Sequence, residues 1–288
     1  MGDVIGGLIA VLGSIVGSVL LLFIVRRYVH IDHSFEKHND VTGICVTMIG
    51  TLIAVILAFM VYAVWDRFEN AKATSEHEGV ELIATYRMSG AMEPKKRDAM
   101  RLMLTEYAEA VRSEEWPAMA HGKVGKKARA LIEQIYGEVL SVEPKTNSQY
   151  ILIDHMLYTV TDISTDRSTR LVLSQSELPE GLWIVMIVGC IVTVLAFCLQ
   201  WVERPVVHYL LVGMMSGMVA LVLFTIKLLD HPFQGSLCVK PSGISHSIDY
   251  FKAHAHDTLG TFAPDDDDTS IASLGRGRAA LGSLALDK

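Results

Sequence analysis

The chain has 288 residues, of which 51% are hydrophobic, and its mean hydropathy is +0.35. This composition is too apolar for an ordinary soluble domain and favours a membrane protein. The formal net charge of −7 excludes a nucleic acid as a partner held by electrostatic attraction.

Most of the apolar side chains fall in four uncharged runs. A helix of about 20 residues crosses the roughly 30 Å hydrocarbon core of a bilayer, and backbone amides inside that core must bond within the segment. One such run could be the buried helix of a soluble enzyme, but four predict four transmembrane helices. The runs are Val4–Val25, Val41–Trp65, Leu182–Val202 and Val206–Ile226.

The first run is predicted to be a retained helix rather than a signal peptide. Its N-terminal flank carries Asp3 and no Lys or Arg. Arg26 and Arg27 follow it, where a signal peptide would have small residues at its cleavage site.

The polar stretch between the two pairs of runs is predicted to be a water-soluble helical bundle. Apolar residues recur at helical spacing in three of its segments, and prolines separate these segments. No helix breaker follows Trp65, so the second membrane helix should continue into this domain as one rod. The predicted order is a first transmembrane pair (1–65), the helical domain (66–181), a second transmembrane hairpin (182–229), a post-membrane segment (230–260) and a disordered tail (261–288).

No motif typical of an enzyme is present in the sequence. Gly-Xaa-Ser-Xaa-Gly, a phosphate loop and His-Glu-Xaa-Xaa-His are all absent, and the four cysteines form no disulfide or zinc pattern. We therefore expect no catalytic residues, no cofactor and no metal. Glu114 and Glu115 could form a carboxylate pair, but neighbours on a helix point apart. We expect them at an exposed helix end that stops at Trp116 and Pro117.

One face of the second membrane helix carries Thr51, Val55 and Phe59, spaced by four residues. In an oligomer with this helix at its centre, that face would form stacked rings, and narrow apolar rings can gate ions by dewetting. The same spacing fits packing against lipid or neighbouring helices, and the spacing alone favours this simpler interpretation.

Four segments resemble the bacterial bestrophin-like domain proteins, a family distantly related to the bestrophin anion channels. The similarity spans roughly residues 38–250 and includes the order of helix pair, helical domain and helix pair. It implies an all-α membrane protein with a bestrophin-like fold. The segments are His38–Gly43, Leu57–Ala71, Glu115–Pro117 and Leu178–Trp183.

The resemblance to bestrophins also implies pore residues. Their second helix carries Leu-Gly-Phe-Tyr-Val, with Arg-Trp-Trp eight residues after the Phe, and this chain has Leu57–Val61 with Arg67 at that interval. Phe59 would match the innermost aromatic residue of the channel neck. Val55 and Thr51 would occupy the other two neck positions. Bestrophins usually have larger apolar residues at these positions, so Thr51 departs from the pattern. Arg67 would attract anions at the pore mouth, although the same position suits an interfacial anchor.

After their fourth membrane helix, bestrophins have a Pro-Phe-Gly turn followed by an acidic calcium clasp. The corresponding turn here contains Asp230, Pro232, Phe233 and Gly235. Ser236–Lys240 follows where the acidic residues should be, so the resemblance does not extend to calcium binding.

Two functions fit these observations. The first is a homo-oligomeric ion channel, a pentamer if it follows the bestrophins, that conducts inorganic anions along the second membrane helix. The alternative is a non-conducting, membrane-anchored scaffold or sensor whose helical domain binds a partner protein. Both place the chain in a lipid bilayer, which the resemblance identifies as the bacterial cytoplasmic membrane. Flanking charges do not decide the orientation, and the resemblance favours a cytoplasmic helical domain.

Overall fold

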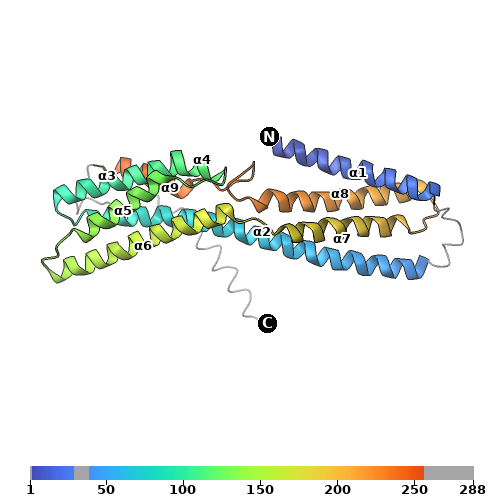
Figure 1. Cartoon of the computed structure of the whole chain (residues 1–288), viewed down its shortest axis with the longest axis horizontal. Coiled ribbons are helices and arrows are strands. Elements are labelled where there is room, and N and C mark those ends of the chain that lie inside the picture. Colours follow the sequence, from blue (N-terminus) through green and yellow to red (C-terminus); the bar gives the residue numbers. More distant parts are fainter. Residues whose placement is uncertain (1, 29–38, 256–288) are drawn as a thin grey trace.

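A computed structural model of the chain describes residues 2–28 and 39–255, and the predicted tail lies outside these ranges. Within them the chain forms nine α-helices and one π-helical turn, with no strand. The molecule is elongated, with the membrane helices at one end and the helical domain at the other (Figure 1). The predicted all-α class, with two helix pairs around a helical domain, is confirmed.

Four helices are long and apolar enough to cross a membrane, and they correspond to the four predicted runs, although the third helix ends at Cys198, before the predicted end at Val202. Within the membrane end, α1 packs along α8, while α2 packs against α7 and α8. At most 28% of the residues in any of their apolar windows are buried in the single chain. Lipid or neighbouring subunits must therefore cover the rest. The four are α1 (Gly2–Tyr28), α2 (Asn39–Ser89), α7 (Glu180–Cys198) and α8 (Pro205–Asp230).

Helix α2 is one unbroken helix of 51 residues, as the absence of a breaker after Trp65 predicted. At 1.5 Å per residue it is about 75 Å long. Its first half belongs to the membrane end, and its second half runs through the helical domain beside α6 and α9 (Figure 1). The two ends of the molecule therefore share one continuous helix.

The helical domain surrounds a core to which five helices contribute. Pro94 begins α3 at a position where its missing N–H costs nothing, and the side chain of Thr146 caps α6 by accepting from Gln149 N. The core residues include Leu82, Leu104, Ile135, Val160 and Ile248. The helices are the second half of α2, α3 (Pro94–Ala110), α5 (Lys126–Leu140), α6 (Asn147–Gln175) and α9 (Ser242–Ala253), with η2 (Val111–Glu115) and α4 (Trp116–Met119) joining α3 to α5.

The expected helix end at Trp116 and Pro117 is wrong. The helix widens into the π turn η2 and continues as α4 to Met119. Pro117 has no N–H to donate to the preceding turn, and a wider turn accommodates that loss. The segment ends instead at Gly122, whose φ of 67° lies in the left-handed region that favours glycine.

The post-membrane helix α9 lies against α2 at backbone contact. A Cβ added at Gly243 would lie 2.6 Å from Ser75 O and 2.8 Å from Glu76 Cα, and a Cβ on Gly79 would meet the backbone of Gly243. Only glycine allows two helices to approach this closely. The chain that follows the membrane hairpin is therefore fixed to the second half of α2, within the helical domain.

Candidate functional site

The three predicted pore residues share the exposed face of α2. Phe59 and Val55 are 66% and 48% exposed in the single chain. Thr51 is also exposed, and its hydroxyl donates to Thr47 O at 2.8 Å on its own helix. The opposite face packs against α7 and α8 through Ile53 and Leu57. The chain itself thus leaves this apolar face uncovered, and a pore-lining role for it remains a prediction.

Beyond the apolar run, the same face of α2 carries an acid rather than Arg67. At about 100° per residue, Asp66 lies within about 20° of both Val55 and Phe59, whereas Arg67 lies about 120° from Val55. Asp66 is exposed, and its carboxylate accepts from Asn70 Nδ2 at 3.1 Å. The side chain of Arg67 is directed toward α8 instead.

Arg67 is part of a polar junction between the membrane helices and the helical domain. Its guanidinium lies 3.3 Å from Asp230 Oδ1 at the end of α8. Asp230 is 3% exposed and also accepts from Leu178 N at 2.9 Å and from Trp183 Nε1 at 3.4 Å. One carboxylate therefore joins α2, the link before α7, and α7 itself. The carboxylate of Asp230 offsets the charge of Arg67. The role of Arg67 at a pore mouth remains a prediction.

The predicted post-membrane turn packs on the helical domain. Phe233 is buried edge-on against Trp116, with ring centroids 5.5 Å apart. Trp116 Nε1 donates to Val239 O at 3.2 Å, and Val239 N donates to Pro232 O at 2.8 Å. Gly235 has a φ of 77°, which explains a glycine at this position. The turn thus closes the junction from the side of the domain.

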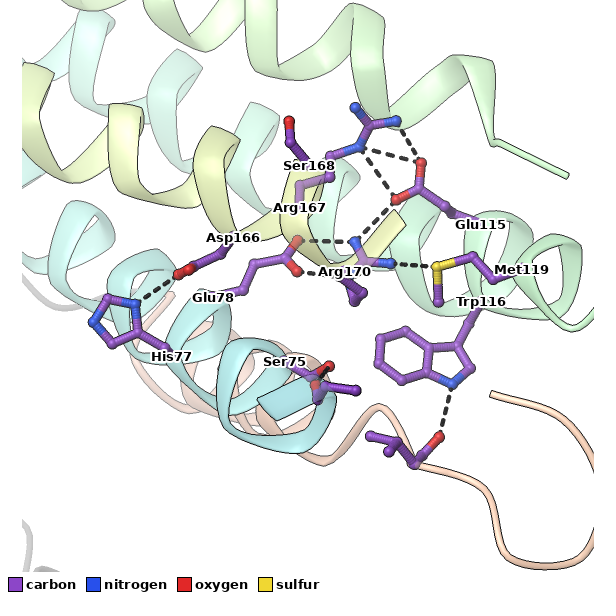
Figure 2. Close-up of polar contacts among 12 residues, drawn as sticks. Ser75, His77, Glu78, Glu115, Trp116, Met119, Asp166, Arg167, Ser168 and Arg170 are labelled. Carbon is purple, nitrogen blue, oxygen red and sulfur yellow. Dashed lines mark hydrogen bonds and ion pairs between the residues drawn. The ribbon is translucent and has the colours of Figure 1, made fainter. Parts of the chain in front are cut away.

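Next to this junction, the helical domain contains a fully buried set of charges (Figure 2). Arg170 Nε lies 2.8 Å from Glu78 Oε2, and Arg170 Nη2 lies 2.9 Å from Glu115 Oε1. Arg167 Nε donates to both oxygens of Glu115 at 3.2 Å. The side chains of Glu78, Glu115 and Arg170 are 0% exposed. Two carboxylates facing two guanidiniums leave no net charge in the core, as buried ions require.

Further contacts complete this buried ion cluster of Glu78, Glu115, Arg167 and Arg170. Tyr107 donates to Glu78 Oε1 at 2.7 Å, and burial together with that carboxylate raises the pKa of Tyr107 well above its usual range. Burial alone would lower the pKa of Arg170, but Glu78, Tyr107 and Glu115 together outweigh it and the net pKa is raised. The cluster joins α2, η2 and α6 and leaves neither carboxylate free to act as a base.

The Bestrophin-like domain family model matches residues 12–244, from the first half of α1 to the start of α9. The chain belongs to the bestrophin-like family. The matched range contains the exposed face of α2, the junction and the buried ion cluster. Together with the four membrane helices, this makes the bestrophin-like chain an integral membrane protein.

Solved structures show the same fold. One described as a membrane protein has a TM-score of 0.66 at 11% identity and covers 88% of this chain and 99% of its own. Two variants of a bacterial bestrophin homologue from Klebsiella pneumoniae have TM-scores of 0.65 at 11% and 13% identity. They cover 89% and 84% of this chain, and 100% and 94% of their own. No curated protein matches the chain.

The expectation that Glu114 and Glu115 form an exposed helix end is half wrong for this bestrophin-like chain. They do point apart, and Glu114 is exposed beside Lys127, but Glu115 is buried among arginines. A signal for this was present in α6. Val160 and Ile163 are buried, and the same spacing of three and four residues leads to Arg167 and Arg170. The buried face of α6 thus continues from apolar residues to two arginines, and this pattern predicts that buried acidic residues pair with them.

Proposed function

We propose that this bestrophin-like protein is a homo-oligomeric ion channel of the bacterial cytoplasmic membrane, with α2 lining the pore. The observation that carries the proposal is the uncovered apolar face of α2 at Thr51, Val55 and Phe59. In a closed ring with α2 innermost, this face would form successive constrictions, with Phe59 the bulkiest. By the resemblance, the ring is a pentamer and the helical domain lies in the cytoplasm.

Inorganic anions are the proposed permeant ions because the bestrophins that the chain resembles conduct anions. The nearby charges bear on this choice. Arg67 is paired with Asp230, so its field at the pore axis is weakened, while Asp66 lies on the side of Phe59. An exposed acid near a pore entrance concentrates cations. Flux must therefore be measured for chloride and for potassium on the same vesicles.

The test is ion flux into liposomes that contain the purified protein, wild type beside Phe59→Ala. A matched control is Phe23→Ala, because Phe23 is a similarly exposed aromatic residue on α1. Widening the constriction should raise flux several-fold in Phe59→Ala and leave it unchanged in Phe23→Ala. The mass in detergent should correspond to a closed oligomer. An absence of flux in all three proteins, or a monomeric mass, would overturn the proposal.

The alternative is a non-conducting scaffold, and one observation favours it. The helical domain exposes Tyr150, Ile151 and Tyr158 on α6, each more than 60% exposed. Such side chains suit contact with a protein, either a partner or a second subunit. A scaffold would show no flux in any variant, and charge substitutions at Ile151 and Tyr158 would abolish binding of the partner without changing the mass of the oligomer.

A further inference from the structure

The membrane end contains a groove between α1, α7 and α8 that the channel proposal does not use. Its volume is about 840 Å³, within the range of about 300–1,000 Å³ typical of small-ligand sites. Apolar side chains of α7 and α8 form most of its walls, among them Ile187, Ile191 and Leu223. A space of this kind inside a bilayer calls for an apolar occupant.

The groove exists because α1 presents small residues along one line. Gly6, Ala10, Ser14 and Gly17 line it at spacings of four and three, so they share one face of the helix. A Cβ added at Gly6 or Gly17 would meet nothing within 4 Å. At Gly7, by contrast, a Cβ would meet the ring of Phe224, so the next face of α1 is packed tightly on α8. The space is therefore a property of one helix face rather than of loose packing.

The groove has a polar mouth. Partway along the groove, the hydroxyls of Ser18 and Ser216 lie 2.7 Å apart and hold α1 to α8, and the lining continues past Ser18 to Leu21. At the mouth stands Lys227, which is exposed and makes no ion pair within the described part of the chain. Gln234 and His231 lie beside it, with His231 Nδ1 3.8 Å from Glu177 Oε1, and no acidic residue is among the described residues that line the groove. The mouth faces the helical domain, because α8 ends there at the Asp230 junction (Figure 1).

The part of the groove between Lys227 and Ser216 is as deep as one leaflet of a bilayer. Ser216 and Lys227 are 11 residues apart on α8, which at 1.5 Å per residue gives about 16 Å. Half of the roughly 30 Å hydrocarbon core is about 15 Å. A chain that enters beside Lys227 and ends near Ser216 would therefore reach from the membrane surface to the midplane.

We propose that this groove binds one anionic phospholipid from the leaflet on the side of the helical domain. The acyl chain would lie along the small residues of α1, and the phosphate would bind Lys227 and the polar groups at the mouth. Basic side chains at the membrane surface attract anionic headgroups, and the flexible stem of a lysine can reach them. The site is separate from the α2 face, so it does not depend on ion conduction.

The test titrates phosphatidylglycerol into the detergent-solubilised full chain and counts bound lipids by native mass spectrometry, with phosphatidylcholine of identical acyl chains for comparison. Gly6→Leu would fill the groove. Gly13→Leu is its matched control, because a Cβ on Gly13 also meets nothing within 4 Å, but Gly13 does not line the groove. Lys227→Gln is compared with Arg204→Gln, an exposed cation at the opposite end of α8.

We expect one tightly bound phosphatidylglycerol per chain in the wild type and in Gly13→Leu. Each methylene kept out of the groove lowers affinity about fourfold, so Gly6→Leu should bind at least tenfold more weakly. Lys227→Gln should reduce the preference for phosphatidylglycerol over phosphatidylcholine about fivefold, and Arg204→Gln should not. Equal binding by Gly6→Leu and Gly13→Leu would overturn the proposal. A Gly6→Leu protein that binds lipid normally but loses its oligomeric mass would show that the groove is a subunit contact instead.

Discussion

Replacing Glu115 by Gln should destabilise the helical domain far more than the same change at Glu114. Glu115 has a fully buried side chain and accepts from both Arg167 and Arg170. Without its charge, Glu78 is the one carboxylate left to face two guanidiniums, so one positive charge stays buried and uncompensated. Removing one partner of a buried ion pair costs about 3–5 kcal/mol. Since a glutamine can still accept hydrogen bonds, we expect about 3 kcal/mol.

The control is unusually well matched because the two residues are adjacent. The side chain of Glu114 is 52% exposed and lies 3.5 Å from Lys127, and exposed pairs of this kind contribute less than about 1 kcal/mol. In thermal unfolding of the detergent-solubilised protein, followed by far-ultraviolet circular dichroism, Glu115→Gln should lower Tm by about 6–12 °C. Glu114→Gln should change it by no more than about 4 °C. Equal shifts for the two variants would refute a stabilising role for the buried ion cluster.

Two further predictions test the α2–α9 contact and the charge near the proposed pore. Gly243→Ala should lower Tm, because overpacking against the α2 backbone costs about 1–3 kcal/mol. Gly137→Ala, which has open space around its Cβ, should raise Tm, because alanine has a higher helix propensity than glycine by up to about 1 kcal/mol. Tm shifts of the same sign in both variants would contradict the close α2–α9 contact. Asp66→Asn should raise the ratio of chloride to potassium flux in liposomes. Arg67→Gln should leave that ratio unchanged and lower Tm. A flux ratio that changes in Arg67→Gln but not in Asp66→Asn would show that the arginine faces the ions.

The architecture could be predicted from sequence because hydropathy is a local property. The length of each apolar run decides whether it can span a bilayer, and the absence of a breaker after Trp65 is enough to make α2 continuous. Helical spacing likewise predicted the three apolar stripes of the domain. These inferences use residues within a few turns of one another, where the sequence carries the information directly.

The buried ion cluster could not be predicted in the same way because its partners are distant in the chain. Glu78 and Arg170 are 92 residues apart, and no short-range sequence pattern indicates that these two residues form a pair. Spacing could have indicated that Arg167 and Arg170 continue a buried stripe, but not which acids meet them. Arg67 shows the same limit. Its position after the membrane run is equally suitable for a pore mouth or an anchor, and only the folded chain brings Asp230 to it.

The continuity of α2 also has a mechanical consequence. A helix without a hinge transmits rotation along its whole length, so turning the helical domain about the α2 axis turns Phe59 with it. Side chains extend to about 5–6 Å from a helix axis, so a rotation of 20° would move the phenyl ring by about 2 Å. Repeated around a ring, such a displacement would change the width of the opening from every side at once. A stimulus acting far outside the membrane could therefore reach the proposed constriction without any loop having to move.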